Sequence, residues 1–371
     1  ALDMAKKSIV LLKNENSLLP INKNGQKITL IGHLADDNNS PLGNWRGAGE
    51  SNTAVTVLEG LENYGNNSIT YKKGVDLYYG ETNFHNRVKL NHKDKTGFKE
   101  AKIAAKSADI VVMVLGEEGF QSGEGRSRTE LGLPGLQQEL LEEVYKVNKN
   151  IVLVLMNGRP LNLTWADENI PAILETWHLG TQSGNAIAEV LYGNYNPSGK
   201  LTMSFPRNVG QVPLYYNYKK TGRPGASSAE VTKSTYADVE NSPLYPFGYG
   251  LSYTSFSYSD FSLSSKEITR DDTIIASVKI TNTGKVKGKE VVQMYIRDHY
   301  GSLARPVKEL KGFELLELNP GETKEVSFEI DNSKLLYYTA NDRWESENGK
   351  FSVFIGGDSD VKENKSFDLI N

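Results

Sequence analysis

Two unbroken apolar runs constrain the fold of this chain more than any other feature of its sequence. Residues 110–115 read Ile-Val-Val-Met-Val-Leu, and residues 151–155 read Ile-Val-Leu-Val-Leu. A strand that is apolar on both faces is typical of a parallel sheet that is covered by helices on each side. The runs therefore predict a layered α/β domain.

The segments around these runs alternate between strand and helix patterns. We expect strands at Lys27–Leu34, Ile69–Lys73, Asp109–Gly116, Ile151–Met156, Ala172–Thr176 and Leu201–Phe205. Helical patterns lie between them at Val55–Tyr64, Phe98–Ser107, Pro134–Val147 and Ser183–Leu191. This alternation predicts that residues 1–205 form an α/β sandwich domain with a mostly parallel sheet.

The first residues have the pattern of an amphipathic helix. Leu2, Ala5, Ile9 and Leu12 recur at helical spacing, without the basic stretch and long apolar run of a signal peptide. Because a native protein seldom begins inside such a helix, we expect the sequence to be a fragment. No apolar run reaches the roughly 18–20 residues that a bilayer crossing needs, so we expect no membrane partner.

The second half of the chain has a different pattern. Residues 206–257 mix prolines, glycines and tyrosines without a regular period, which predicts an extended connector. In residues 258–371, alternating segments such as Ile274–Thr281 and Thr323–Ile330 are separated by short turn signals. This pattern predicts an all-β sandwich of the immunoglobulin or fibronectin type III kind.

Composition excludes several classes of function. Forty-two basic and 46 acidic residues give a formal charge of 42 − 46 = −4, which argues against nucleic acid or an anionic membrane as partner. The chain has no cysteine, so it has neither a disulfide nor a thiolate metal site. Its five histidines are scattered without a metal-ligand spacing. We therefore expect no metal or cofactor, and neutral partners such as sugars fit this balance.

The loop over residues 116–131 is the richest in chemistry. Its charged side chains are Glu117, Glu118, Glu124, Arg126, Arg128 and Glu130. Ligands gather outside the carboxyl ends of strands in an open α/β sheet, and this loop leaves such an end. Glu124, between Gly123 and Gly125, is placed to be presented as a general acid. A merely solvated charged loop is the alternative.

A second loop carries Gly43, Asn44 and Trp45. Its glycines lack the G-x-G-x-x-G spacing and the Lys-Ser/Thr of a P-loop, which disfavours a nucleotide site without excluding one. Trp45 could stack on a sugar ring or pack into its own domain. His178, which follows the predicted strand at 172–176, could line the same cleft or be a buried, hydrogen-bonded structural histidine.

Several segments together resemble the part of family 3 glycoside hydrolases that follows the catalytic barrel. They are Ser8–Asn16, Leu18–Pro20, Ile31–Ala35, Val152–Pro160, Gly193–Leu201, Pro246–Tyr253, Val291–Tyr295, Arg305–Phe313 and Pro320–Glu322. They occur in family order and cover essentially the whole chain. The family relatives that it most resembles are bacterial periplasmic β-glucosidases with a fibronectin type III-like domain.

This resemblance implies a retaining exo-β-glycosidase that acts on β-linked glucosides or oligosaccharides, in the periplasm or outside the cell. In such enzymes a (β/α)8-type barrel supplies an aspartate nucleophile, and the second domain supplies the acid/base glutamate. The segment 122–129 matches the glutamate-bearing loop and so implies that role for Glu124, although Glu117 and Glu118 lie nearby. The barrel, expected upstream, is absent from this sequence, so the chain alone should be inactive.

The resemblance also suggests residues that contact the substrate. Trp45 corresponds to a tryptophan that flanks the leaving-group subsite, and we expect substrate contacts from Trp45, Arg126 and Arg128. Either arginine could instead hold the loop or a neighbouring carboxylate. The rival interpretation of the whole chain is a carbohydrate-binding or scaffolding module without chemistry of its own.

Overall fold

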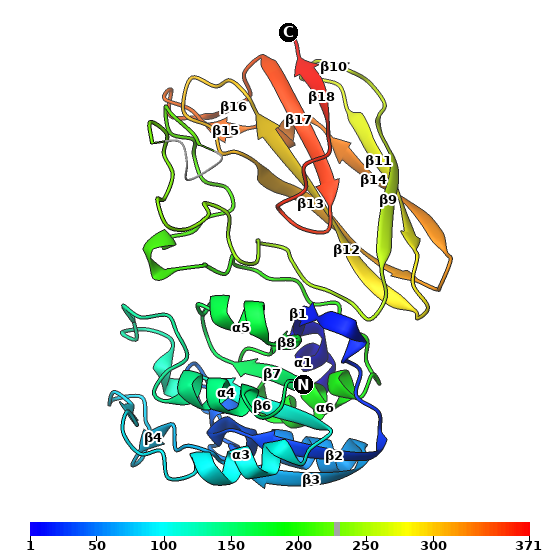
Figure 1. Cartoon of the computed structure of the whole chain (residues 1–371). Coiled ribbons are helices and arrows are strands. Elements are labelled where there is room, and N and C mark those ends of the chain that lie inside the picture. The colour runs from blue at the N-terminus through cyan, green and yellow to red at the C-terminus, as the bar shows by residue number, and fades with distance from the viewer. Residues whose placement is uncertain (226–230) are drawn as a thin grey trace. The chain divides into compact units, whose positions relative to one another are not determined.

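The computed structural model describes residues 1–225 and 231–371. The chain divides into two compact units. The first unit comprises Ala1–Lys200 and Pro206–Gly210, and the second unit comprises Leu201–Phe205 and Gln211–Asn371. Each unit has its own sheets, and each is described separately below (Figure 1).

A six-stranded sheet forms the centre of the first unit. Its strands are β1 (Val10–Asn14), β2 (Asn24–Ile31), β3 (Asn66–Lys72), β6 (Ile110–Gly116), β7 (Ile151–Met156) and β8 (Ala172–Glu175). The strand order is β1-β8-β7-β6-β2-β3. Only the edge strand β1 runs antiparallel to its neighbour, so the prediction of a mostly parallel sheet is confirmed.

Helices cover both faces of this sheet (Figure 1). They are α1 (Leu2–Ser8), α2 (Val57–Tyr64), α3 (Phe98–Lys106), α4 (Gln137–Tyr145), α5 (Thr164–Asn169) and α6 (Ser183–Leu191). α6 contacts both α1 and α2, whereas α3 contacts α4. Every residue of β6 and β7 is buried between these layers, which explains why both strands are apolar on each face.

Two predictions about the sheet of the first unit were wrong. The N-terminal helix ends at Ser8, and the buried residues that follow it, Val10 to Leu12, pair with β8 as an edge strand instead of continuing the helix. Leu201–Phe205 is not a strand of this sheet. Its backbone bonds to residues 244–249 of the second unit and forms only an isolated bridge, between Phe205 and Tyr245.

The second unit is a two-sheet β-sandwich, as the alternating pattern predicts. One sheet has the order β10-β18-β17-β12-β13 and the other β14-β11-β9. The strands are β9 (Phe256–Leu263), β10 (Glu267–Ile268), β11 (Ile274–Asn282), β12 (Gly288–Asp298), β13 (Glu309–Leu318), β14 (Thr323–Ile330), β17 (Gly349–Gly356) and β18 (Asn364–Leu369). Alternate residues such as Val278, Met294 and Phe351 fill one buried core between the sheets.

Three smaller pairings and segments complete the chain. Two-stranded ribbons join β4 (Tyr78–Tyr79) with β5 (Lys89–Leu90), and β15 (Tyr337–Tyr338) with β16 (Trp344–Glu345). Before β9 begins, the described part of the predicted connector contains a short 3-10 helix at Val209–Gln211 and isolated β-bridges at Lys219, Pro224, Ser234 and Tyr245. Residues 226–230 of that connector lie outside the described residues.

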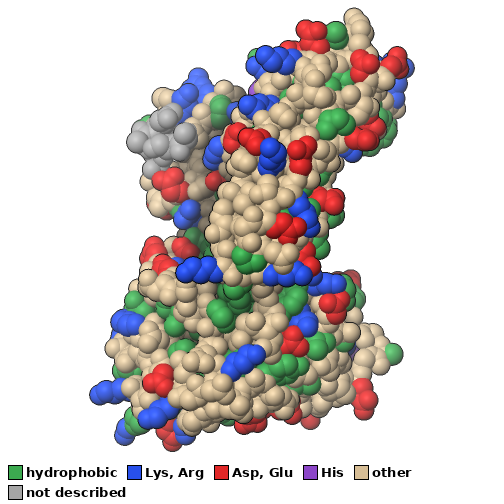
Figure 2. Space-filling view, turned by 90° about the vertical axis from the view of Figure 1, so that its right-hand side faces the viewer, with side chains coloured by type: hydrophobic (Ala, Val, Ile, Leu, Met, Phe, Trp, Pro, Cys, Tyr) green, Lys and Arg blue, Asp and Glu red, His purple; other side chains and the backbone are tan. Residues whose placement is uncertain are grey.

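The distribution of surface charge and the length of the helices are relevant to the expectation of no nucleic-acid or membrane partner. Acidic and basic side chains are interspersed over the face seen in Figure 2, without a large region of a single sign. Within residues 1–225 and 231–371, none of the helices combines the length and the apolar character that spanning a bilayer requires.

Candidate active site

Parallel strands bring several loops to one edge of the first unit. β2, β6, β7 and β8 run in the same direction, so the loops that follow their carboxyl ends share that edge. We call residues 32–56, after β2, the Trp45 loop, and residues 117–136, after β6, the Glu124 loop. This edge is where an open α/β sheet offers a ligand site.

Glu124 is presented to solvent by its glycine neighbours. Gly123 and Gly125 have φ angles of +108° and +68°, a region that side chains with a Cβ rarely adopt. The Glu124 side chain is exposed and makes no hydrogen bond or ion pair with any residue that the structure describes. Its carboxylate is therefore available to a ligand.

The Glu124 loop contacts the Trp45 loop directly. The buried Asn44 side chain donates a hydrogen bond of 2.5 Å to the carbonyl oxygen of Ser122. A Cβ placed on Gly123 would lie 2.3 Å from Asn44 Nδ2 and 3.2 Å from Trp45 Nε1. The glycine is thus needed for the close approach, and the two sequence-predicted residues Glu124 and Trp45 lie at adjoining positions.

The indole of Trp45 is exposed, as a ring that contacts a ligand must be. Its side chain is 68% exposed, so it is not packed into its own domain. The indole meets the ring of Phe84 edge-on, with centroids 6.2 Å apart. Arg126 donates a hydrogen bond to the Phe84 carbonyl oxygen, while its Nε atom is buried without a partner among the described residues. Arg126 therefore ties the Glu124 loop to the loop that carries Phe84.

Arg128 makes its contacts within the Glu124 loop. Its Nη1 lies 2.8 Å from Oε1 of Glu117, and its Nη2 donates to the carbonyl oxygen of Gly132 at 2.9 Å. Glu117 is fully buried and is also 2.9 Å from Arg159 Nε and 3.2 Å from the Gly158 amide. The carboxylate of Glu117 is therefore fully engaged, and the two arginines brace the base of the Glu124 loop.

Glu118 is likewise turned inward. It is fully buried, and its side chain accepts a hydrogen bond of 2.7 Å from the Phe120 amide at the start of a 3-10 helix, Gly119–Gln121. Burial raises the pKa of Glu118. Neither Glu117 nor Glu118 reaches the surface, so of these two residues and Glu124 only Glu124 is placed for contact with a ligand.

A third buried carboxyl group, Glu175, was not predicted from the sequence as part of a site. Glu175, the last residue of β8, accepts hydrogen bonds of 2.8 Å from the Trp177 amide and 3.0 Å from Asn157 Nδ2. Burial raises the pKa of Glu175 to about 8. Its contact holds Trp177 at a φ of +53°, an uncommon conformation for an aromatic residue. A carboxylate at the end of an apolar strand was the only signal in the sequence.

His178 lies beneath the Trp45 loop. A Cβ on Gly43 would be 3.4 Å from His178 Cβ, and a Cβ on Gly158 would be 3.3 Å from His178 Cε1. Burial lowers the pKa of His178, so the imidazole is held neutral. Its Nε2 is buried without a partner among the described residues, whereas the ring bonds to the backbone of Glu117, so the expectation of a hydrogen-bonded histidine is met in part.

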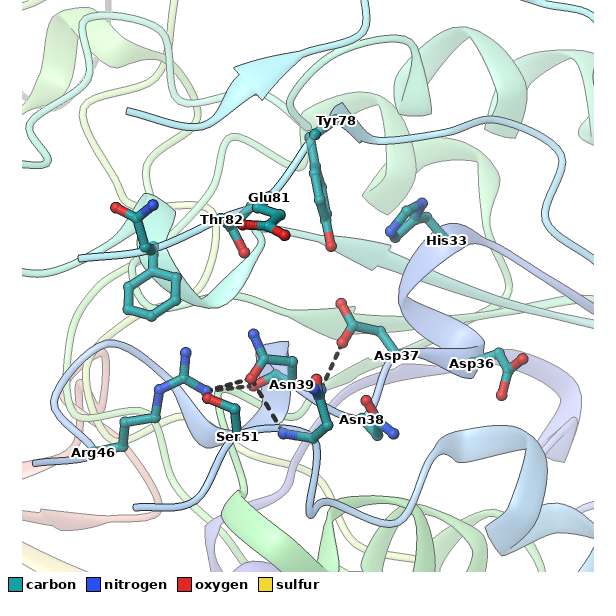
Figure 3. Close-up of a pocket in the computed structure, with 14 residues that line it drawn as sticks. His33, Asp36, Asp37, Asn38, Asn39, Arg46, Ser51, Tyr78, Glu81 and Thr82 are labelled. Atoms are coloured by element: carbon teal, nitrogen blue, oxygen red, sulfur yellow. Dashed lines mark hydrogen bonds between the residues drawn. The ribbon is translucent and has the colours of Figure 1, made fainter. Parts of the chain in front are cut away.

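A polar cavity of about 610 Å³ opens beside the Trp45 loop (Figure 3). Its lining residues include Asp37, Arg46, Tyr78 and Phe120. The Tyr78 hydroxyl and the Asp37 carboxylate point toward each other across it (Figure 3), and burial, followed by the charge of Asp37, raises the pKa of Tyr78 to about 12. The segment around Tyr78 was not singled out in the sequence.

The glycine cluster of the Trp45 loop does not form a phosphate cradle around a free cation. Arg46 is held by the Asn39 side chain at 2.5 Å, and its guanidinium lies 4.5 Å from the centroid of the Phe120 ring. Within the described parts of the chain, no three acidic, histidine or cysteine side chains gather in an arrangement for a metal ion. The geometry presents one free carboxylate beside one exposed indole.

Comparison with known families matches both units. The model for the glycosyl hydrolase family 3 C-terminal domain matches residues 9–253, and a fibronectin type III-like domain matches residues 290–359. A periplasmic beta-glucosidase of Salmonella typhimurium is 47% identical over all of this chain, and a beta-xylosidase of Formosa agariphila is 42% identical.

Solved structures agree with the sequence relatives. The structure of a beta-glucosidase from Listeria innocua in complex with glucose superposes with a TM-score of 0.90 at 35% identity, over 100% of this chain and 49% of that one. The chain likewise covers 50% and 49% of the Salmonella and Formosa proteins, so it spans about half the length of the curated relatives it matches. This chain belongs to glycoside hydrolase family 3 and carries the family's C-terminal domain, followed by a fibronectin type III-like domain.

Proposed function

We propose that this chain is the C-terminal portion of a retaining exo-β-glycosidase and that Glu124 is the acid/base of the reaction. The carrying observation is the exposed Glu124 carboxylate, without an ion pair among the described residues, beside the exposed indole of Trp45. Relatives named as beta-glucosidases and a beta-xylosidase support terminal glucose or xylose as the sugar. A Listeria innocua relative solved with laminaribiose supports an oligosaccharide substrate.

The mechanism requires a second carboxylate. Retaining glycosidases hold two carboxyl groups about 5–5.5 Å apart across the scissile bond. We place the nucleophile, an aspartate, on an N-terminal barrel domain outside these 371 residues, which accords with the chain's covering half of its relatives. Glu124 protonates the departing oxygen, and it then takes a proton from the water that releases the sugar.

The neighbouring side chains have supporting roles in this proposal. Trp45 offers its ring to the apolar face of the leaving group, and its N–H to a hydroxyl. Arg126 and Arg128 act as positioning residues, because their side chains contact Phe84, Glu117 and Gly132 of the same unit. Substrate contact by either arginine would require these contacts to open.

Substitution of Glu124 by glutamine in the full-length enzyme tests the role. We expect kcat/KM to fall by roughly 10²–10⁴-fold for substrates with poor leaving groups, which need protonation, and much less for activated aryl glycosides. Azide should restore turnover of the activated substrate by attacking the glycosyl-enzyme in place of water. Glu130→Gln, another exposed carboxylate of the same loop, is the matched control. Equal kinetics of Glu124→Gln and wild type would remove Glu124 from the role.

The isolated chain gives a second test. Since it would hold one carboxylate of the pair, we expect it to hydrolyse no aryl β-glucoside above the background rate. Turnover by the purified chain that disappears in Glu124→Gln would show that the second carboxylate also lies within these 371 residues.

A carbohydrate-binding or scaffolding role is the alternative, and the exposed Trp45 and the adjacent polar cavity favour it. It predicts that Trp45→Ala weakens sugar binding while Glu124→Gln leaves every rate unchanged. For the location we propose the periplasm or the exterior of the cell, supported by the Salmonella relative, which is named as periplasmic.

A further inference from the structure

A cavity in the second unit gathers positive charge far in sequence from Glu124. Its volume is about 290 Å³, and it lies between the end of β12, the segment that leads to β13, and Lys220. The cationic side chains that line it are Lys220, Arg297 and Arg305, with His299 beside them. The protein as a whole carries a net charge of −4, so this local excess is not a consequence of composition.

Only part of this charge is neutralised within the unit. Asp298, the one carboxylate that lines the cavity in the described chain, lies 3.1 Å from Arg305 and also accepts from the Tyr300 amide at 3.2 Å. Arg305 is further held by Glu309 at 3.1 Å. Lys220 and Arg297, in contrast, have no ion pair with a described residue. Two cations are thus left to face the cavity.

The state of His299 reflects this environment. Burial lowers the pKa of His299, and the charges of Arg297, Lys350 and Lys220 lower it further. Its Nε2 lies 2.8 Å from the hydroxyl oxygen of Ser352 on β17. The imidazole is therefore neutral and polar, and the permanent charge at the cavity comes from the lysine and arginine side chains.

The rim of the cavity has the features of a sugar-binding surface. Tyr300 is 72% exposed and Leu303 is 42% exposed. An exposed tyrosine ring can stack against the C–H face of a sugar while its hydroxyl bonds to water or to the ligand. The planar guanidinium of Arg297 suits a carboxylate, which it can hold through two parallel hydrogen bonds.

We propose that this cavity binds an acidic sugar unit, a uronic acid within a polysaccharide, with its carboxylate between Arg297 and Lys220 and its ring against Tyr300. The choice of a sugar rests on the proposed function, whereas the binding of an anion does not. Such a site would hold a charged polysaccharide on the enzyme independently of the reaction at Glu124.

Binding to the 371-residue chain tests the proposal without any hydrolysis. We expect polygalacturonate in a native gel to retard the chain, while neutral hydroxyethylcellulose does not, and trigalacturonate to bind in calorimetry more weakly as salt rises. Arg297→Gln with Lys220→Gln should raise the Kd for trigalacturonate at least about tenfold, since each lost hydrogen bond is to a charged group. Circular dichroism melting checks that the variants are folded.

A control for the loss of positive charge lies next to the same strand. Lys285 is exposed and lies just before Gly288, the first residue of β12, whereas Arg297 lies near the other end of that strand, about 30 Å from Gly288 at the usual rise per residue. Lys285→Gln removes one positive charge and should leave the Kd within about twofold, as expected of an independent surface change. An equal loss in Lys285→Gln would reveal non-specific charge attraction and overturn the site.

Inorganic phosphate and sulfate separate a sugar site from a general anion site. We expect each to bind far more weakly than trigalacturonate, and Tyr300→Ala to weaken trigalacturonate but not phosphate. Equal affinity for phosphate and trigalacturonate, or no retardation by polygalacturonate at low salt, would overturn the assignment. Because no result depends on Glu124, failure here leaves the proposed function intact.

Discussion

The side-chain amide of Asn44 donates a hydrogen bond of 2.5 Å to the main-chain carbonyl oxygen of Ser122. This bond joins two residues of different loops that are 78 positions apart in the sequence. Asn44 immediately precedes Trp45, and Ser122 lies two residues before Glu124. The direction in which the carboxylate is presented therefore depends on a loop of a different strand, and not on the Glu124 loop alone.

Alanine at Gly123 should break this relationship. The new methyl group would lie 2.3 Å from Asn44 Nδ2, so either Asn44 or the backbone must move. We expect Gly123→Ala to lower the melting temperature of the chain. On the proposed role of Glu124, it should also lower kcat/KM of the full-length enzyme by about tenfold or more, since small displacements of a catalytic group are costly.

Gly125→Ala is the matched control for that substitution. Gly125 also has a positive φ, +68°, but an added Cβ would meet no atom within 4 Å. It therefore shares the backbone strain and lacks the collision with Asn44. If both variants lose the same activity, strain alone is responsible and the contact with Asn44 is not needed.

Loss of the Glu117 charge should destabilise the first unit. Glu117 is fully buried between Arg128 and Arg159, and its removal leaves two partly buried guanidinium groups without a carboxylate. Breaking a buried pair in this way costs about 3–5 kcal/mol. We expect Glu117→Ala to lower the free energy of unfolding in urea by this amount, and Glu130→Ala, on the exposed part of the loop, to change it by less than about 0.5 kcal/mol. Equal stability of the two variants would contradict a bracing role for Glu117.

Much of the fold could be predicted because its signals are local. The burial of each of these strands can be read from its own residues: β6 and β7 are apolar throughout, and β11 and β14 alternate between buried and more exposed residues. The N-terminal prediction failed because Ile9 and Leu12 satisfy a helical spacing and are also part of a continuous apolar run. Val10–Asn14 is a strand because it pairs with β8, which lies more than 150 residues away in the sequence.

The site was predictable in part for the same reason. Glycines on each side of Glu124 identify a presented carboxylate from neighbouring residues alone. The partners of Arg128 and the environment of Glu175 depend on side chains from other strands, and no local pattern records them. Residues whose function is set by long-range contacts therefore need the structure.

Trp45 should matter for the ligand and not for stability. Its side chain is 68% exposed and makes an edge-on contact with Phe84, whereas Trp344 of the second unit is 67% exposed and meets Tyr338 in a similar way. We expect Trp45→Ala and Trp344→Ala to change the melting temperature equally little. Only Trp45→Ala should raise KM for a disaccharide, by up to about tenfold, since aromatic contacts contribute about 0.5–1.5 kcal/mol. An unchanged KM would exclude Trp45 from the leaving-group site.

Glu175 should make stability depend on pH. The pKa of its carboxyl is about 8 in the folded chain, because of burial, and 4.5 is the ordinary value. Below pH 4.5 the Glu175 carboxyl is protonated in both the folded and the unfolded chain. Its stabilising contribution to the folded chain is therefore fully present there. As the pH rises toward 8, the unfolded chain loses the proton first, and stability falls by up to about 1.4 kcal/mol for each pH unit.

Glu175→Gln removes this titration while keeping a side-chain oxygen that can accept from the Trp177 amide. The difference in unfolding free energy between the variant and wild type should therefore grow in favour of the variant from pH 5 to pH 8, and then level off. Urea titrations at several pH values measure that difference, which also cancels the contribution of Glu118, whose pKa is raised as well. Parallel stability curves for Glu175→Gln and wild type would mean that Glu175 is already ionised in the folded chain, with Asn157 and the Trp177 amide stabilising its charge.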